Sequence, residues 1–364
     1  MKEKRVAVDS IRKFMKSSFV AVGVPETDAD IIVDILIRSD LRGIRSHGIG
    51  RLKLYIDRIR DGILQPQTHI ETIKEYPATA LLDGNNGMGH VISYKAMELA
   101  IQKAQSTGIA AVSVRNSSHF GIAGYYADMA IQNDMAGMAV TNARPSIAPT
   151  FGKNPMMGTN PIAFGCPTDE ECPFLLDMAT SIAQRGKIEV LERQHQNIPP
   201  GWAIDGNGNV VSNPSDLLKM LKQKAASFLP LGGAGEKLGG YKGYGMAMMV
   251  EILSSLFSGG PFGWGLSGFD ENQQKIPHRL GHFFIAVNIS AFIDIKEFKK
   301  LAGDLVRSMR QSETLPGHER IYTAGEKEFD HEQSVPRTGI PLNARLQENL
   351  RAIAADLDIT ADFL

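Results

Sequence analysis

From residue 80 onward, the chain alternates short apolar runs with helical patterns in an irregular order. The runs at 109–114 and 138–141 are typical of buried strands, and helical patterns lie around 93–105 and 122–132. Further strands are predicted at 80–83, 162–164, 174–177 and 283–287. The order is not a clean βαβ repeat. The sequence therefore predicts a mixed α/β core rather than a regular parallel repeat.

The two ends of the chain have a helical pattern instead. Apolar residues recur at three- and four-residue steps over 8–22, and two more helical patterns follow. Near the other end the pattern returns to helix, loop and helix, the last at 342–357. We therefore expect residues 1–76 and 296–364 to form one helical lobe, and residues 77–295 to form the α/β core that binds cofactor and substrate.

Composition narrows the class of protein. The 364 residues are 43% apolar and 22% charged, as in ordinary globular proteins. A net charge of −1 argues against a nucleic-acid partner, and no apolar run is long enough for a membrane span. The first residues lead into an amphipathic segment with no apolar signal core, so the expected location is the cytoplasm. The two cysteines, Cys166 and Cys172, are too few for a disulfide framework.

The segment DLRGIRSHGIGR at 40–51 places a histidine among glycines and arginines. If Gly48 begins a helix, then His47, Arg51 and Tyr55 follow at four-residue steps on one face. Imidazole transfers protons near neutral pH, and guanidinium binds a carboxylate through two parallel hydrogen bonds. The pattern suits a small acid with an adjacent hydroxyl or carbonyl. The alternative is a solvated helix face with an incidental histidine.

A second histidine, His119, follows the predicted strand at 109–114 and precedes a predicted helix. Residues at the carboxyl ends of strands in α/β folds often line the ligand crevice. Its neighbours Ser117, Ser118 and Gly121 are small and leave room for a ligand. The alternative is a turn or core histidine whose hydrogen bonds are satisfied within the protein.

The glycine-rich segment GGYKGYG at 239–245 leads directly into an apolar run. A glycine-rich loop that opens a helix exposes backbone N–H groups to an anion, and Lys242 beside Gly243 would add a full charge. This is not a P-loop, and no usable G-x-G-x-x-G follows the first strand, so a conventional Rossmann site is unsupported. The alternative is a flexible surface turn.

Other motifs carry less information alone. Thr159, Asn160 and Asp177 border predicted strands and offer groups that suit a ribose or a substrate. The nine histidines form no H-x-H or H-E-x-x-H spacing, so we expect no catalytic metal. The G-x-S-x-G elbow of serine hydrolases is also missing.

Taken together, these segments resemble the type-2 malate/L-lactate dehydrogenase family, whose members also act on ureidoglycolate, sulfolactate, diketogulonate and cyclic imino acids. The matching motifs, in chain order, are D-x-R-G-x-x-S-H-G at 40–48, S-S-H-F-G at 117–121, G-T-N-P at 158–161, D-M-A-T-S at 177–181, R-G-K at 185–187, G-W-A-I-D at 201–205, and L-P-L-G-G with G-G-Y-K-G-Y-G within 229–245. Seven such strings in one order make the resemblance specific.

The resemblance implies a non-Rossmann fold, a homodimer and NADH or NADPH without a metal. It matches His47 and His119 to acid/base positions and Arg51 to the residue that binds the substrate carboxylate. Some relatives have a cofactor-binding serine where this chain has Ala143. With the glycine-rich loop included, the predicted cofactor contacts are Ala143, Asp177, Met178, Ala179, Lys242, Gly243, Gly325, Glu326 and Lys327.

The predicted function is hydride transfer between NAD, or NADP, and a small 2-hydroxy or 2-keto acid. We expect His119 to carry the proton while His47 orients the substrate. Predicted substrate contacts are Arg51, Arg45, Tyr55, Thr159 and Asn160. Malate is favoured because a second carboxylate needs another cation, which Arg42 or Arg45 would supply. Alternatively, both of these arginines brace the helical lobe through salt bridges.

Two other functions remain open at this stage. One is a reductase of another keto or imino acid, with the same hydride chemistry. The other is a non-catalytic protein that binds a nucleotide or an organic acid. Binding alone would not need two histidines beside an arginine, and this favours the enzyme.

Overall fold

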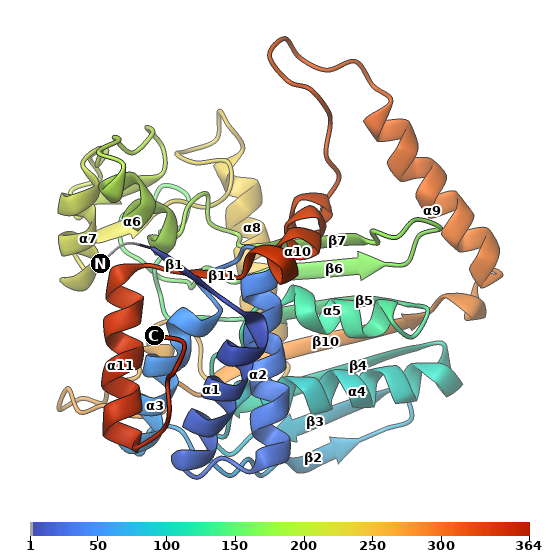
Figure 1. The fold of residues 1–364 in the computed structure, drawn as a ribbon. Coiled ribbons are helices and arrows are strands. Elements are labelled where there is room, and N and C mark those ends of the chain that lie inside the picture. The colour runs from blue at the N-terminus through green and yellow to red at the C-terminus, as the bar shows by residue number, and fades with distance from the viewer. Residues whose placement is uncertain (1–2) are drawn as a thin grey trace.

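The computed structural model describes residues 3–364, and its centre is a seven-stranded mixed sheet (Figure 1). In spatial order the strands are β2 (Glu71–Glu75), β3 (Thr79–Asp83), β4 (Ile109–Ser117), β10 (Leu280–Asn288), β5 (Met135–Thr141), β6 (Ile162–Cys166) and β7 (Phe174–Met178). Only β3 and β4 run parallel, and every other neighbouring pair is antiparallel. The predicted mixed α/β fold is confirmed, and the sheet is not the doubly wound parallel kind.

Strand β10 joins two parts of the sheet that are close in the sequence. It pairs with β4 on one side and with β5 on the other, although it lies more than a hundred residues further along the chain. Its side chains alternate between faces, as the two-residue period of a strand requires. Phe284 belongs to the core with α4 and α5, and Phe283 belongs to the core on the opposite face.

Helices cover both faces of the sheet (Figure 1). The helices α4 (Gly89–Thr107) and α5 (Gly124–Ile131) lie on one face, and α8 (Gly240–Glu251) with its π-helical extension η2 (Ile252–Leu256) lies on the other. Small residues of α4 and α5, such as Ala100 and Ala127, allow close packing on β4 and β5. The helices predicted around 93–105 and 122–132 are therefore confirmed.

Segments from both ends of the chain share one hydrophobic cluster. They are α1 (Val8–Ala21), α2 (Glu26–Leu41), α3 (Leu52–Arg60), α10 (Glu326–Thr338) and α11 (Ala344–Leu357), with the two-stranded pair β1 (Lys4–Val6) and β11 (Ile340–Leu342). Phe19 and Leu36 meet Leu350 and Ile353 in this cluster. The helix α9 (Ile295–Arg310) projects away from it, and the chain then returns to α10 (Figure 1). The domain boundaries given above stay a prediction.

A third unit has its own small core. It contains α6 (Arg185–Arg193), β8 (Ala203–Asp205), α7 (Pro214–Lys222) and β9 (Ala226–Phe228). The sequence analysis proposed no elements here, because the apolar runs are short. In residues 3–364 no helix combines the length and apolarity needed to cross a membrane.

Candidate active site

The loop that carries His47 is fixed by a buried carboxylate at the end of α2. The Ile49 N–H donates to Asp40 Oδ2 at 2.7 Å, at the start of a single 3₁₀ turn, η1 (Ile49–Arg51), that leads into α3. A Cβ on Gly48 would lie 2.0 Å from Asp40 Oδ1, so only glycine fits between them. Burial raises the pKa of Asp40 to about 7. Asp40 therefore fixes the backbone at Gly48 and Ile49, and with it the position of the preceding residue, His47.

The two histidines singled out in the sequence lie face to face. The rings of His47 and His119 are stacked, with centroids 5.3 Å apart and planes 19° apart. His119 is reached directly after β4, and His47 precedes η1, so the pair joins the sheet to the helical segments. His47 Nδ1 lies 2.8 Å from Ser46 Oγ.

Tyr55 supports His119 from behind. The tyrosine is fully buried in α3, and its hydroxyl lies 2.6 Å from His119 Nδ1. The Gly121 N–H donates to the same nitrogen at 3.3 Å, so Nδ1 accepts and the neutral ring carries its proton on Nε2. Burial raises the pKa of Tyr55, which therefore stays a neutral phenol. Predicted as a substrate contact, Tyr55 is instead placed to orient His119.

Burial keeps both histidines uncharged in the free protein. It lowers the pKa of His47 to about 4, and the nearby Arg51 guanidinium acts in the same direction. It also lowers the pKa of His119 well below the ordinary value, helped by His47 and Arg51. Each neutral ring can accept a proton, and an anion bound at the Arg51 guanidinium would favour that protonation.

The arginines of the motif have different environments. Arg51 Nε donates to the Ser46 carbonyl at 2.5 Å, and within residues 3–364 the guanidinium has no ion pair with a carboxylate. Arg42 is buried and pairs with Glu332 at 3.4 Å. Arg45 is exposed, and its charge lowers the pKa of Asp40. Arg42 therefore braces the helices, and Arg51 keeps its charge available for a ligand.

Asn160, predicted as a substrate contact, is used within the protein. Its Oδ1 accepts from the Ala143 N–H at 3.2 Å, and its Nδ2 donates to Glu251 Oε2 at 2.7 Å. It is fully buried. The Thr159 carbonyl accepts the backbone N–H of Thr180 at 2.9 Å. These bonds tie the segment before β6 to the residue after β5, to α8 and to the segment after β7, and both amide hydrogens of Asn160 are used within the protein.

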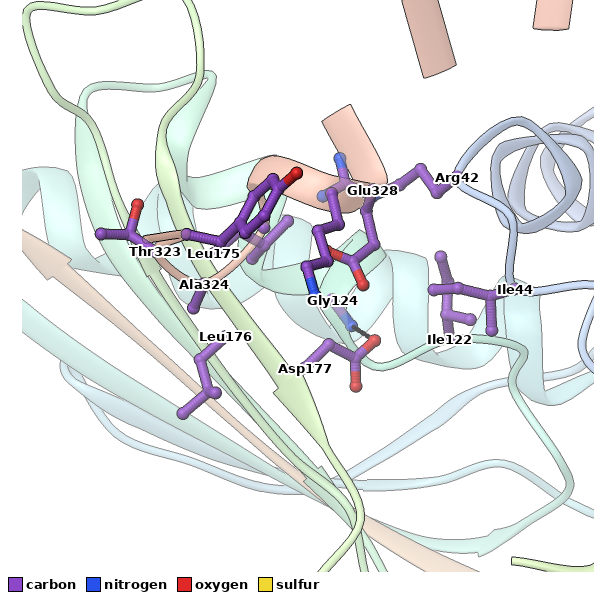
Figure 2. Close-up of a pocket in the computed structure, with 13 residues that line it drawn as sticks. Arg42, Ile44, Ile122, Gly124, Leu175, Leu176, Asp177, Thr323, Ala324 and Glu328 are labelled. Atoms are coloured by element: carbon purple, nitrogen blue, oxygen red, sulfur yellow. Dashed lines mark hydrogen bonds between the residues drawn. The ribbon is translucent and has the colours of Figure 1, made fainter. Parts of the chain in front are cut away.

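A cavity of about 310 Å³ lies between β7 and the start of α10 (Figure 2). Asp177 lies on its wall, with Oδ2 accepting the Gly124 N–H at 2.8 Å. Gly325 and Lys327 line it from the other side. Burial raises the pKa of Asp177 to about 6. The cavity thus brings together two segments, far apart in the sequence, that were predicted to contact the cofactor.

The other predicted cofactor residues differ in their surroundings. Glu326 is buried, pairs with Arg310 at 2.9 Å and accepts the Thr323 N–H at 2.7 Å, so it stabilises the return to α10. Met178 ends β7, and Ala179 follows it. Among the described residues, no group of three or more histidine, cysteine or acidic side chains is arranged to hold a metal ion.

The glycine-rich loop is packed rather than loose. A Cβ on Gly243 would lie 2.2 Å from the Leu231 carbonyl oxygen, so this glycine is required for close backbone approach. The Leu231 N–H donates to the Thr180 carbonyl at 2.8 Å. This contact sets the first turn of α8 beside the segment after β7. Lys242 in that turn is exposed.

The sequence analysis missed Arg58 and His278. Arg58 lies seven residues after Arg51, and its Nη2 is 3.1 Å from His278 Nε2. The seven-residue spacing, two helical turns, was the available signal for Arg58. No local sequence pattern indicated His278, because its contact with Arg58 joins residues 220 positions apart and depends on tertiary packing.

Comparisons with known proteins identify the family and the fold of this chain. Residues 6–351 match the family model described as malate/L-lactate dehydrogenase. The chain is 44% identical over 350 residues to a malate dehydrogenase of Pyrococcus abyssi, covering 96% of this chain and 94% of that one. Its fold matches a malate dehydrogenase structure from Entamoeba histolytica with a TM-score of 0.95 at 42% identity, covering 99% of each chain. A sulfolactate dehydrogenase from Methanocaldococcus jannaschii matches with a TM-score of 0.88 at 35% identity, again over 99% of each chain.

Proposed function

Because this chain belongs to the malate/L-lactate dehydrogenase family, we propose that it interconverts malate and oxaloacetate with a nicotinamide cofactor. As a member of this family it is a 2-hydroxy-acid dehydrogenase. The observation that carries the proposal is the stacked pair of His47 and His119 beside Arg51, a guanidinium without a carboxylate partner. The cofactor, when bound, accepts or supplies the hydride.

His119 is the proton carrier in this proposal. To take the hydroxyl proton of malate it needs a free lone pair on Nε2, so the neutral ring must move its own proton to Nδ1. The Tyr55 hydroxyl, 2.6 Å away, accommodates this change because it can accept as well as donate, and the longer bond from the Gly121 N–H, at 3.3 Å, is given up. In the reduction direction the charged ring donates the Nε2 proton to the oxygen that becomes the hydroxyl. His47 stacks on this ring and limits its orientations.

Arg51 couples substrate binding to protonation. A carboxylate held by its guanidinium places a negative charge near His119 and offsets the cation that lowers the pKa of that ring. Substrate binding is therefore expected to raise the pKa of His119, so that the anion and the proton are taken up together. Fixing the carboxylate also holds the reacting carbon in one orientation toward the cofactor.

The first experiment follows oxidation of the reduced cofactor by its absorbance. Purified protein is mixed with oxaloacetate, pyruvate, sulfopyruvate and cyclic imino acids, with NADH and NADPH in separate series and a chelator present. Fast oxidation with oxaloacetate supports the proposal. Activity only with an imino acid would replace the proposed substrate, and absence of cofactor binding would overturn the dehydrogenase assignment altogether.

We propose NAD as the cofactor, with NADP as the alternative. Relatives of this chain are named for each of the two forms. Asp177, Gly325 and Lys327 line the cavity proposed for part of the cofactor. Lys242, exposed in the first turn of α8, is proposed as a further cofactor contact. The two cofactor series of the absorbance assay decide between the forms.

The low pKa values of the histidines predict an unusual pH profile. For malate oxidation, kcat/KM reports the free enzyme, in which His119 is already neutral, so it should stay flat between about pH 6 and 8. It should fall only as the pH drops through the lowered pKa, below the ordinary histidine value of about 6.5. For oxaloacetate reduction the charged ring is needed, so kcat/KM should fall about tenfold per pH unit above that pKa. A malate profile with a midpoint at or above pH ~6.5 would contradict the assignment.

We also propose that the protein is a homodimer. Leu301, Leu305 and Met309 recur at four-residue steps on α9, and each is more than half exposed. Met249 and Ile252 form a second exposed apolar strip along α8 and η2. A second copy of the chain would cover such faces, which are costly to leave in water.

The dimer is tested with Leu305→Glu. A buried glutamate in the interface should raise the dimer dissociation constant about 30-fold or more, because a charge loses hydration there. Sedimentation velocity over a concentration series measures the shift, with Lys300→Glu, on the same helix, as the control. An unchanged mass distribution for Leu305→Glu would exclude α9 from the interface.

A further inference from the structure

Arg58 lies on the same side of α3 as the groups that contact His119. Arg51, Tyr55 and Arg58 follow at steps of four and three residues, which places them on one helix face. Tyr55, between the two arginines, contacts His119 through its hydroxyl. The row therefore turns two guanidinium groups toward the proton carrier rather than one.

Three arginines in this region have no carboxylate partner. Within residues 3–364, Arg51, Arg58 and Arg144 form no ion pair, whereas Arg60, two residues further along α3, pairs with Asp356. Burial lowers the pKa of Arg58, and the charges of Arg51 and Arg144 lower it further. Positive charges close enough to disfavour one another favour an anion between them.

A neutral histidine holds Arg58 in place. The Leu266 carbonyl can only accept, so His278 Nδ1, 3.1 Å from it, carries the proton. His278 Nε2 then has a free lone pair and accepts from Arg58 Nη2 at 3.1 Å. A Cβ on Gly268 would lie 2.4 Å from His278 Cε1, so the ring is closely confined. The guanidinium is thus oriented without losing its charge to a carboxylate.

The position of Arg58 relates it to the reacting centre. With His278 it lines a small cavity of about 10 Å³ whose wall includes Ser117 and Ser118, the two residues directly before His119. Arg144 directly follows Ala143, and its guanidinium lies 5.7 Å from the ring centroid of Phe269. The charge of Arg58 acts on His119, and the charge of Arg144 acts on Arg58 and on His278.

We propose that Arg58, oriented by His278 and assisted by Arg144, binds the second acidic group of a dianionic 2-oxo acid. This rests on the proposed function, in which Arg51 binds the first carboxylate. With one carboxylate at Arg51 and the other at Arg58, the keto oxygen lies between them beside His119. The second cation that a dicarboxylate needs is therefore assigned to Arg58 rather than to Arg42, which pairs with Glu332.

The test compares dianionic and monoanionic substrates. In Arg58→Gln, the ratio of kcat/KM for oxaloacetate to kcat/KM for pyruvate should fall about 10- to 100-fold, because a hydrogen bond to a charged group is lost. Arg58→Lys should recover only part of the ratio, since a point charge replaces the planar fork. The inhibition constant of malonate, a dianion that cannot be reduced, should rise in parallel, and that of acetate should rise far less.

Arg60→Gln is the matched control, because this arginine lies on the same helix and pairs at the surface. Arg144→Gln is the second variant; its side chain is exposed, so the fold tolerates the change, and a several-fold loss in the same ratio is expected. If Arg58→Gln is folded and active but keeps the wild-type ratio and malonate inhibition, the assignment of Arg58 is wrong. If wild-type protein reduces no 2-oxo acid, the proposed function fails instead.

Discussion

His119→Ala lowers kcat for malate oxidation by about two to four orders of magnitude, the usual contribution of a positioned general base. The reason is geometric and electrostatic. The ring is neutral in the free protein and is held through Nδ1 by Tyr55 and Gly121, so Nε2 is the nitrogen that the proposed role uses. Stopped-flow measurement of a single turnover separates this loss from any change in substrate binding.

His119→Gln serves as the companion variant, since it keeps a hydrogen-bonding side chain but cannot carry a proton. His195→Ala, at an exposed position, is the control for loss of a histidine elsewhere. Both site variants should still bind the reduced cofactor, seen by its fluorescence. If His119→Ala retained wild-type turnover while His47→Ala abolished it, the two histidines would have to exchange roles.

Arg51→Lys raises KM for oxaloacetate about 100-fold with a much smaller change in kcat, because a single ammonium cannot reproduce two parallel hydrogen bonds to a carboxylate. The Ser46 carbonyl fixes Nε of the native side chain and aims its remaining nitrogens. Lysine has no equivalent of that nitrogen. Steady-state kinetics at saturating cofactor give both constants.

The control for Arg51→Lys is Arg60→Lys, which changes a paired surface arginine on the same helix. Cofactor KM should stay near the wild-type value in both variants. A loss confined to kcat would mean that Arg51 acts on the transition state alone, and the proposed role in ground-state binding would have to be abandoned.

Much of the local structure could be predicted from the sequence. The periodicity of residues 8–22 and the apolar runs at 109–114 and 283–287 indicated a helix and two strands that the structure contains. These predictions succeed because helix and strand periods depend on nearby residues. The short elements between 185 and 228 were missed, since each buries too few apolar residues to show a period.

In the candidate site, too, local spacings could be predicted from the sequence and long-range contacts could not. The four-residue spacing of Arg51 and Tyr55 was visible, although the expected helix does not begin at Gly48 and His47 lies in the loop before it. The contact of Tyr55 with His119 joins positions 64 residues apart. Asn160 was predicted as a substrate contact, and the G-T-N-P string does not reveal that its side chain bonds to Ala143 and Glu251. Long-range pairs such as Arg58 with His278 depend on tertiary packing, which the sequence pattern does not contain.

The place of β10 in the sheet has a consequence for how the protein is made. During synthesis, β4 and β5 leave the ribosome long before the strand that pairs with both of them. Until then their facing edges stay open, and open strand edges are where nascent chains associate wrongly. These two edges are closed only once residues 280–288 have emerged and paired with both strands.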